Sequence, residues 1–350
     1  MASVSTSKAE VSYIQSGLLS NPPLRADGRG LYDYRTVSLE TGVAPLANGS
    51  AHLSIGQNPH DGGGGTEVLA AAKLEVESVD PGKGEGMDGG RIVCTVSCSP
   101  SAYPHLSSSA LDDLQHDLTT LLHQTLAHPS LHPSNLAILA GKNSWLLNLD
   151  CVVLADAGNA HDALFMAARA ALWDCKVPRT RGVEYKAAAA PAAKVAESGE
   201  MDVDRDAEAQ QSGFDTRSIA RAVDFELPDY WDEGEVLGGR ERWPVCVTLN
   251  IAAPPPGSKG SLVPYLDAIQ QEEAATPLRL LLVFSFPPAT SARLQAMRIL
   301  GSGELESDQI RAFVGTGENY ARQLWDALNG KLRDEDIRRG QRARDRFARR

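Results

Sequence analysis

The chain has 350 residues, of which 42% are hydrophobic, and its formal net charge at pH 7 is −11. This length suits one large domain or two ordinary ones, and such a strong negative charge argues against nucleic-acid binding over the whole surface. No apolar run reaches the roughly 18 residues that span a bilayer, and the first residues lack the basic and apolar regions of a secretory signal. We therefore expect an intracellular, soluble protein without a membrane partner.

The charge and the cysteines are unevenly placed. Residues 331–350 contain nine Lys or Arg and four Asp or Glu, so the rest of the chain is more acidic than the net charge suggests. An acidic body with a basic tail predicts protein partners and at most a local contact with nucleic acid. Five cysteines are scattered through mostly apolar stretches, which indicates reduced, buried thiols. Neither they nor the histidines have a trusted ligand spacing, so we predict no metal site and no cofactor.

The first half of the chain alternates strands and turns between helices. Ser7 and Glu10 have capping-box spacing, so a helix is predicted over 7–19, and Asn21-Pro22-Pro23 ends it. Leucines recur at every third or fourth position over 110–127, which indicates an amphipathic helix capped by Ser109. A further, Ala-rich helix is predicted over 160–173. The strands of this half are expected at 34–40, 51–55, 66–76, 92–98, 136–140 and 145–154.

The strands and helices of the second half are predicted to begin after a segment of different composition. Residues 187–211 are rich in Ala, Asp and Glu and have almost no large apolar side chains, which is typical of a disordered insertion. A final helix is expected over 307–328, with Gly330 as its stop. The strands of this half are predicted at 245–251, 261–267 and 278–286.

These elements predict an α+β fold of two similar halves in which helices pack on sheets. The predicted divisions are a helical extension (1–23), a first half-domain (24–182), an acidic and Ala-rich disordered insertion (183–223), a second half-domain (224–330) and a basic tail (331–350).

Six short motifs follow one another in a consistent order. They are Arg25-Ala-Asp-Gly-Arg29, Glu40-Thr-Gly-Val43, Ala47-Asn-Gly-Ser-Ala51, Gly65-Thr-Glu-Val68, Asp156-Ala-Gly-Asn-Ala-His-Asp162-Ala163 and Leu266-Asp-Ala-Ile-Gln-Gln-Glu-Glu-Ala274. On these motifs the chain resembles RNase PH-like proteins, and most closely the eukaryotic RNA exosome ring subunits allied to the non-catalytic archaeal ring subunit. The resemblance covers 24–182 and 224–330. It implies the RNase PH-like fold (ribosomal protein S5 domain 2-like), with two β-sheet halves packed with helices.

The resemblance also implies partners and a cellular place. The partners would be other RNase PH-like subunits in a hetero-hexameric ring, RNA-binding cap subunits, an associated exoribonuclease and, in the assembled complex, single-stranded RNA. The processes would be rRNA processing, mRNA decay and RNA degradation generally. The place would be the nucleus and nucleolus, and also the cytoplasm.

Phosphorolysis needs cationic side chains for phosphate and a carboxyl group as general acid. In active family members, the arginines lie just before and within the helix expected at 110–127, and two aspartates lie six residues apart in a later strand and loop. This chain has no Arg or Lys between Arg91 and Lys142. Asp267 matches the first aspartate and Glu273 stands at the second. We therefore assign no catalytic residue and expect Asp267 and Glu273 to be degenerate remnants.

Charged groups in the motifs have more than one interpretation. Asp267, Glu272 and Glu273 either bind Mg²⁺ or form a solvated strand end, which we favour. Arg25 and Arg29 either contact RNA or pair with Asp27 or Asp33 to hold their loop, and we favour the ion pairs.

We also predict structural roles for three aspartates further along the chain. Asp150 and Asp156 are predicted to fix turns, and Asp162 is predicted to pair with Arg169. The glycines of Gly62–Gly65 lack the Lys and Ser or Thr that follow in a nucleotide-binding loop, so a flexible hairpin loop is expected.

The basic tail has two interpretations that the sequence leaves equal. Arg338, Arg339 and Arg342 either contact the phosphate backbone of RNA or belong to a solvated helix end.

The function expected from these observations is a non-catalytic structural subunit of the RNA exosome ring, which helps to form the channel that guides RNA to a separate 3′–5′ exoribonuclease. An active phosphate-dependent 3′–5′ exoribonuclease, with a site shared with a neighbouring subunit, is the alternative. A third hypothesis is an acidic scaffold that uses the same fold for protein contacts only.

Overall fold

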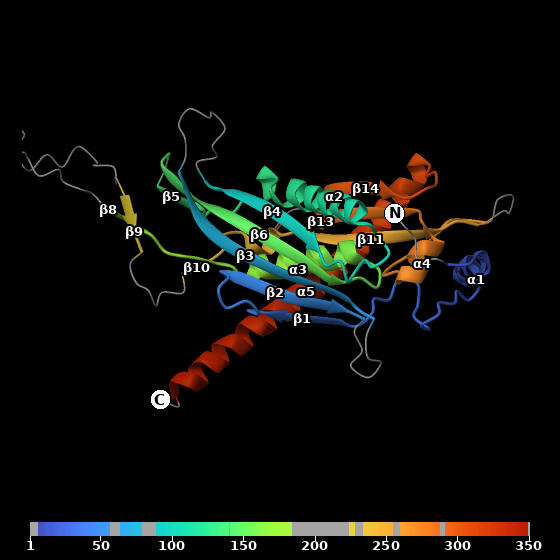
Figure 1. Cartoon of the computed structure of the whole chain (residues 1–350), viewed down its shortest axis with the longest axis horizontal. Helices are drawn as coiled ribbons and strands as arrows, with labels where there is room; N and C mark the ends of the chain where they lie inside the picture. Colours follow the sequence, from blue (N-terminus) through green and yellow to red (C-terminus); the bar gives the residue numbers. More distant parts are fainter. Residues whose placement is uncertain are drawn as a thin grey trace, which may run out of the picture. The chain divides into compact units, whose positions relative to one another are not determined.

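The computed structural model in Figure 1 describes residues 6–56, 64–78, 89–139, 141–183, 224–227, 234–254, 260–287 and 291–348. The chain divides into a large unit, Met1–Val177 with Glu233–Arg350, and a small unit, Pro178–Asp232. In its described part the small unit is an antiparallel pair of short strands, β8 (Arg181–Val183) and β9 (Asp224–Glu226). The insertion predicted at 187–211 lies outside the described residues.

The first sheet of the large unit has six strands in the order β1-β2-β3-β6-β4, with β5 paired to β6. All neighbours are antiparallel except β4 and β6, which run parallel. Buried and more exposed residues alternate along β3, as expected for a sheet that turns one face to a core. The strands are β1 (Val37–Thr41), β2 (Gly49–Ile55), β3 (Thr66–Ser78), β4 (Arg91–Cys98), β5 (Ala137–Leu139) and β6 (Asn143–Ala155).

The second sheet has four antiparallel strands in the order β12-β11-β13-β14. Every residue of β11 and of β13 is buried, in agreement with the mostly apolar sequences of these two strands. The strands are β11 (Val245–Ala252), β12 (Val263–Tyr265), β13 (Arg279–Ser285) and β14 (Arg293–Leu300). Two further strands, β7 (Lys176–Val177) and β10 (Glu235–Val236), pair with each other.

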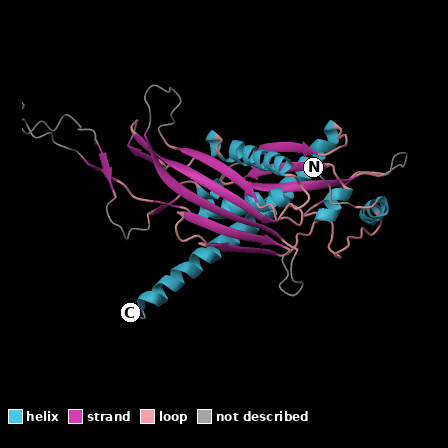
Figure 2. Cartoon of the chain, in the orientation of Figure 1, coloured by secondary structure: helices cyan, strands magenta, loops and turns pink. Residues whose placement is uncertain are grey.

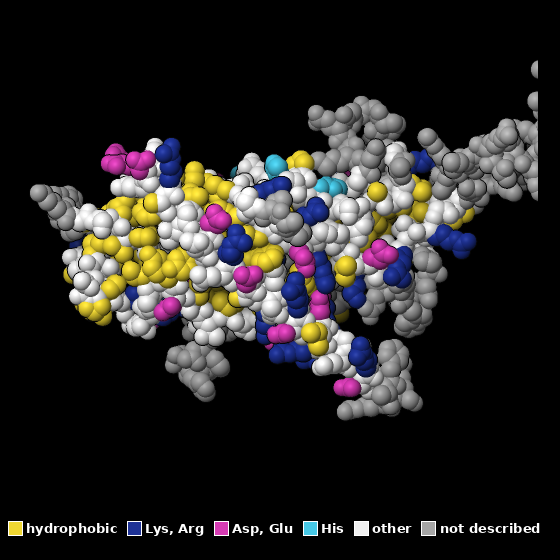
Figure 3. Space-filling view, turned by 180° about the vertical axis from the view of Figure 1, so that it is seen from behind, with side chains coloured by type: hydrophobic (Ala, Val, Ile, Leu, Met, Phe, Trp, Pro, Cys, Tyr) yellow, Lys and Arg dark blue, Asp and Glu magenta, His cyan; other side chains and the backbone are white. Residues whose placement is uncertain are grey.

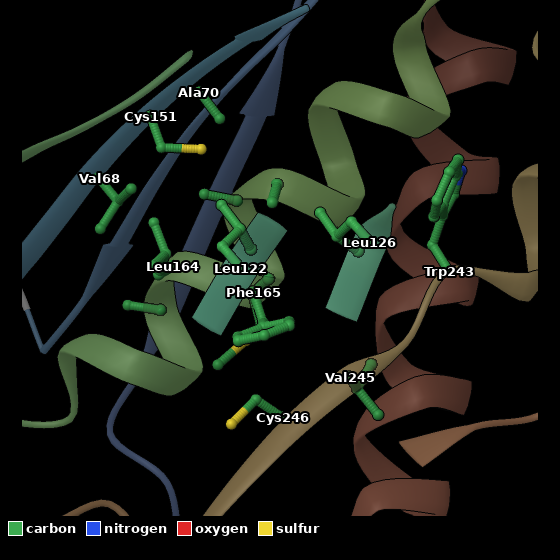
Figure 4. Close-up of a cluster of buried hydrophobic side chains, with 14 of the residues drawn as sticks. Val68, Ala70, Leu122, Leu126, Cys151, Leu164, Phe165, Trp243, Val245 and Cys246 are labelled. Atoms are coloured by element: carbon green, nitrogen blue, oxygen red, sulfur yellow. The ribbon is translucent and has the colours of Figure 1, made fainter. Parts of the chain in front are cut away.

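Helix α3 (Ala160–Asp174) lies between the two sheets, because it packs against β2 and β3 on one side and β11 on the other. All its residues from Ala160 to Trp173 are buried, and its many alanines allow the close approach of both sheets. Figure 4 shows Leu164 and Phe165 between Val68, Ala70 and Cys151 on one side and Val245 and Cys246 on the other. This core confirms the predicted α+β architecture of two sheet halves packed with helices (Figure 2).

The remaining helices cover the outer faces and the ends. Helix α2 packs on β4, and the long helix α5 packs on β11 and β13. Helix α1 contacts α4, and Ser7 and Glu10 form the predicted capping box at the start of α1. The helices are α1 (Lys8–Leu19), α2 (Ser108–Leu126), α4 (Gln270–Ala275) and α5 (Ser307–Ala348), with single 3-10 turns at Pro129–Leu131 and Arg240–Arg242.

Three local predictions are wrong. Ser107, not Ser109, caps α2, because the Ser107 side chain accepts the bond from the Ala110 N–H. Gly330 does not end the last helix, since α5 continues to Ala348 and includes the described part of the predicted tail. The strand expected at 261–267 is reduced to Val263–Tyr265, and α4 and β14 were not predicted.

All five cysteines are buried and unpaired, as the composition indicated. Among the described residues, no helix is both long enough and apolar enough to cross a bilayer.

Candidate functional site

Glu273 and part of the segment around α2, which the resemblance assigned to catalysis, line one cavity of about 650 Å³ in the large unit. The cavity is lined by residues of the segment 103–106, by the first three turns of α2 and by the start of α3 with His161. Helix α4 and the start of β13 also line it, with Glu273 and Arg279. Segments more than 150 residues apart in sequence therefore meet here.

Acidic side chains dominate the cavity. Its lining includes four carboxylates and a single Arg or Lys, Arg279. Arg279 forms an ion pair of 3.1 Å with Glu273, and Arg298 of β14 pairs at 2.7 Å with Asp117. The four carboxylates belong to Asp113, Asp117, Asp156 and Glu273. Like-charge repulsion of about 1–4 kcal/mol per close contact would oppose a phosphate ion in this cavity.

The presence of Arg279 in this cavity was not predicted from the sequence. The sequence reasoning considered only the segment around α2, whereas Arg279 reaches the cavity from β13. The signal was present as a single arginine at the start of an apolar run, Arg279–Phe284. Its partner is the Glu273 carboxylate, so its charge is already compensated by the residue at the second catalytic position.

Three titratable groups of the cavity, His161, Glu273 and Tyr103, have shifted pKa values. Burial lowers the pKa of His161 to about 4, with the nearby Arg279 charge acting in the same direction. Burial raises the pKa of the Glu273 carboxyl, Asp156 adds to this effect and Arg279 opposes it. Burial, together with the Asp156 charge, also raises the pKa of Tyr103. At neutral pH the imidazole of His161 is therefore uncharged.

Asp267 lies outside this cavity and is fully buried. Its carboxylate accepts bonds from the side chains of Arg29 (2.8 Å), Arg35 (2.8 and 2.9 Å) and Asn159 (3.0 Å), and from the backbone N–H of Arg35 (2.7 Å). Burial would raise its pKa, but the bonds and charge of Arg35 and Arg29 lower it. The φ angle of Asp267 is 47°, a left-handed conformation that these bonds hold in place. Asp267 thus joins the N-terminal loop to the second sheet.

Glu272 forms a second buried clamp beside it. Arg25 donates to both Glu272 oxygens, at 3.0 and 2.7 Å, and its side chain is not exposed. The favoured interpretation of the acidic trio is wrong, because Asp267 and Glu272 are buried in ion pairs instead of forming a solvated strand end. Among the described residues, no group of three His, Cys, Asp or Glu is placed to hold a metal ion.

The N-terminal arginines therefore have structural partners. Arg29 pairs with Asp27 at 2.6 Å and donates to the Asp33 backbone carbonyl, which confirms the favoured loop interpretation for this residue. Arg25 pairs with Glu272 and not with Asp27 or Asp33. Its buried guanidinium is not available to RNA in this structure.

The three aspartates of the Leu149–Asn159 region and its following helix behave differently from the prediction. The Asp156 carboxylate accepts from the Gly158 N–H and does fix a turn. Asp150 lies within strand β6 and fixes no turn. Asp162 accepts from Tyr34 and Thr248 hydroxyls, at 3.0 and 2.8 Å, and does not pair with Arg169. Side chains from two segments far apart in the chain bind it, which the sequence spacing could not reveal.

The basic end of the chain is the last turns of α5. Arg338 pairs with Glu335 at 2.7 Å, and Arg339 pairs with Asp174 at the end of α3. Arg342 is exposed. Arg338 and Arg339 thus have intramolecular partners, whereas Arg342 stays accessible. Of the segment Gly62–Gly65, the first two glycines lie outside the described residues.

Comparison with known proteins shows what the chain is similar to. Residues 33–178 match the sequence profile of the RNase PH family, described as "3' exoribonuclease family, domain 1". The chain is also 33% identical over 157 residues to the exosome complex component Rrp42 of Sulfurisphaera tokodaii, covering 45% of this chain and 53% of that protein. It is 28% identical over 223 residues to a Dictyostelium discoideum protein provisionally named as the exosome complex exonuclease RRP42, covering 51% of this chain and 66% of that protein.

Solved structures agree on the fold. A chain of an archaeal exosome core superposes with a TM-score of 0.57 at 20% identity, covering 92% of this chain and 96% of that one. A chain of the Archaeoglobus fulgidus exosome with RNA bound to the active site gives 0.60 at 20% identity, covering 91% and 98%. These matches confirm the RNase PH-like fold. The sequence matches span between about half and two thirds of the first two curated relatives.

Proposed function

We propose that this RNase PH-like chain is a non-catalytic, structural subunit of an RNA exosome ring. The observation that carries the proposal is the acidic cavity: among the described residues four carboxylates line it, and its one lining arginine is paired with Glu273. A reacting phosphate would meet repulsion there. The similarity to Rrp42 exosome components supports the ring in which such a subunit would serve.

The surface of the second sheet supports a role in assembly. Strand β14 is at the edge of its sheet and exposes the large apolar side chains of Leu294, Met297 and Ile299. The rear view in Figure 3 shows hydrophobic side chains gathered in a broad area of the molecule's surface. An edge strand of this kind is prone to associate with another protein. In the proposed ring it would contact a neighbouring RNase PH-like subunit.

The proposed partners, processes and cellular location follow from the assignment of the chain to an RNA exosome ring. The ring would carry RNA-binding cap subunits and an associated exoribonuclease, and single-stranded RNA would pass through its channel. The chain would serve rRNA processing and mRNA decay in the nucleus and nucleolus, and also in the cytoplasm. Of the tail arginines, only Arg342 is proposed as an RNA contact, because Arg338 and Arg339 already pair with carboxylates.

Affinity purification of the tagged full-length chain from its own cells tests the proposal. We expect the other RNase PH-like subunits at equal stoichiometry by quantitative mass spectrometry. As a matched variant, Met297→Asp with Ile299→Asp should release them, because two charges would be buried at the proposed contact. Recovery of the chain without ring subunits, under conditions that retain known complexes, would contradict the proposal.

A further inference from the structure

A buried arginine of α3, Arg169, forms no ion pair with any carboxylate that the structure describes. Its side chain is almost fully buried, and the residue expected to pair with it, Asp162, binds the hydroxyls of Tyr34 and Thr248 instead. Arg169 Nη2 donates to the side-chain oxygen of Asn329 at 2.6 Å. Its Nε and Nη1 are buried and form no hydrogen bond with any described residue. Nearly all buried polar groups in proteins have a partner, so this guanidinium is incompletely satisfied.

The charge of this guanidinium is also uncompensated. Burial lowers the pKa of Arg169 to about 9, so the side chain is still cationic at neutral pH. The Glu241 carboxylate attracts it without a hydrogen bond, and Glu241 itself pairs with Arg333 at 3.2 Å. A buried charge is normally paired, because an isolated ion is costly to remove from water. The folded chain therefore places a cation in its interior without an anion beside it.

The neighbouring side chains of α5 add further donors and no acceptor. The Arg169 guanidinium lies 5.7 Å from the centroid of the Trp325 ring, and Trp325 and Asn329 are one turn apart on α5. Trp325 Nε1 and Asn329 Nδ2 are both buried, and neither has a hydrogen-bond partner in the described part of the chain. The indole can only donate, and the Asn329 oxygen already accepts from Arg169. Four unpartnered buried nitrogens, all of them donors, therefore belong to one cluster.

The donors restrict the class of ligand. A cation would be repelled by Arg169. A water molecule can accept two hydrogen bonds but leaves the charge of the guanidinium uncompensated. A phosphate group carries nearly two negative charges at neutral pH, which exceeds the single charge of Arg169. A small monovalent anion fits best, because it balances one charge and accepts from several N–H groups at once.

We propose that Arg169, Trp325 and Asn329 bind a chloride ion in the interior of the large unit, where α3 packs against α5. The ion would accept from the N–H groups of these three side chains that have no other partner, and it would balance the charge of the guanidinium. It would thereby hold α5 against α3. The inference is independent of the proposed ring, because it depends only on the charge and the unpartnered donors of this cluster.

Unfolding of the full-length chain by urea, an uncharged denaturant, tests the inference. Sodium chloride is varied against sodium gluconate at constant ionic strength, so that only the small anion changes. Above the dissociation constant of the ion, each tenfold rise in chloride should raise the equilibrium constant of folding about tenfold, because the ion binds only the folded chain. Bromide should replace chloride, and crystals grown in bromide should show an anomalous difference peak beside the Arg169 guanidinium.

Variants locate the effect. Arg169→Met removes the cation, and Asn329→Asp supplies a carboxylate of nearly the same shape beside it, so both should abolish the dependence on chloride. Asn329→Asp should also make the chain more stable in gluconate, which keeps the test valid if Arg169→Met does not fold. The matched control Arg311→Met removes an exposed arginine of α5 and should keep the full dependence.

Three results would each overturn the inference. They are equal stability in chloride and gluconate, a chloride dependence that Asn329→Asp retains in full, and bromide crystals without a peak at Arg169. A water molecule in place of the ion would give the first result. Because these experiments use the isolated chain, their failure is separate from a failure of the purification described above.

Discussion

At the residue scale, the N-terminal arginines act inside the protein and not on its surface. Arg25, Arg29 and Arg35 all donate to carboxylates of the segment 267–272. The sequence could predict the Arg29–Asp27 pair, because those residues are two positions apart. It could not predict the pair of Arg25 and Glu272, which are 247 positions apart and meet only once the second sheet has formed.

Substitution of Arg25 tests the buried clamp. Arg25→Met should lower the free energy of unfolding by about 3–5 kcal/mol, because the Glu272 carboxylate loses its buried partner. Urea denaturation measures this loss. The double variant Arg25→Met, Glu272→Gln should recover part of it, while Lys73→Met, at an exposed pair with Glu75, should have no resolvable effect. A loss as small for Arg25→Met as for Lys73→Met would contradict the clamp.

Two adjacent buried residues, His161 and Asp162, should change the stability of the chain with pH in opposite directions. Burial raises the pKa of Asp162 to about 6 from 3.8, and burial lowers the pKa of His161 to about 4 from 6.5. Between about pH 4 and 6 the folded chain holds a proton on Asp162 that the unfolded chain has lost, so this group makes stability fall as the pH rises. In the same window the folded chain lacks a proton that unfolded His161 carries, so this group makes stability rise.

The single variants should separate these two effects. From pH 4 to 6, the stability of Asp162→Asn should rise, relative to the parent chain, by about 3 kcal/mol. The stability of His161→Gln should fall over the same range by a similar amount, again relative to the parent. Chemical denaturation at a series of pH values measures both slopes, and slopes of the same sign would show that the burial assignments are wrong.

At the element scale, local sequence patterns predicted α1, α3 and the buried strands well. Helix caps, alanine content and apolar runs each involve only residues that are close together in the sequence. They failed for β14, whose arginines at 293 and 298 interrupt the apolar pattern, and for α4, which is only six residues long. They also failed at Gly330. Glycine often ends a helix by adopting a left-handed conformation. Gly330 instead lies inside α5, and we attribute the continuation of the helix to its tertiary contacts.

Two glycines of α5 give a matched test of this helix. Gly330 is exposed, and a Cβ added there would meet no atom within 4 Å, so Gly330→Ala should stabilise the chain by about 0.5–1 kcal/mol. At buried Gly317 the added Cβ would lie 2.4 Å from Leu282 Cδ1 in the core. Gly317→Ala should therefore be less stable than Gly330→Ala by about 1–3 kcal/mol in thermal or urea unfolding. Destabilisation by Gly330→Ala would mean that the helix does not continue through this position.

At the scale of the whole large unit, two sheets enclose one buried helix, and the two halves meet at α3. The motifs indicated this architecture because each marks a turn or a strand end of the fold. The contents of the cavity were harder to predict. The absence of arginines around α2 could be counted in the sequence, but Arg279, Arg298 and His161 come from elements that only the folded chain brings to the same place.

We propose that this chain does not bind phosphate for an attack on RNA. Incubation of the assembled complex with a 3′-extended RNA and inorganic phosphate measures it directly, with nucleoside diphosphate release as the readout. We predict that Glu273→Gln in this chain leaves any phosphate-dependent release unchanged and that the isolated chain releases none. Phosphate-dependent release by the isolated chain, or its loss in the complex on Glu273→Gln while the complex stays intact, would contradict the account.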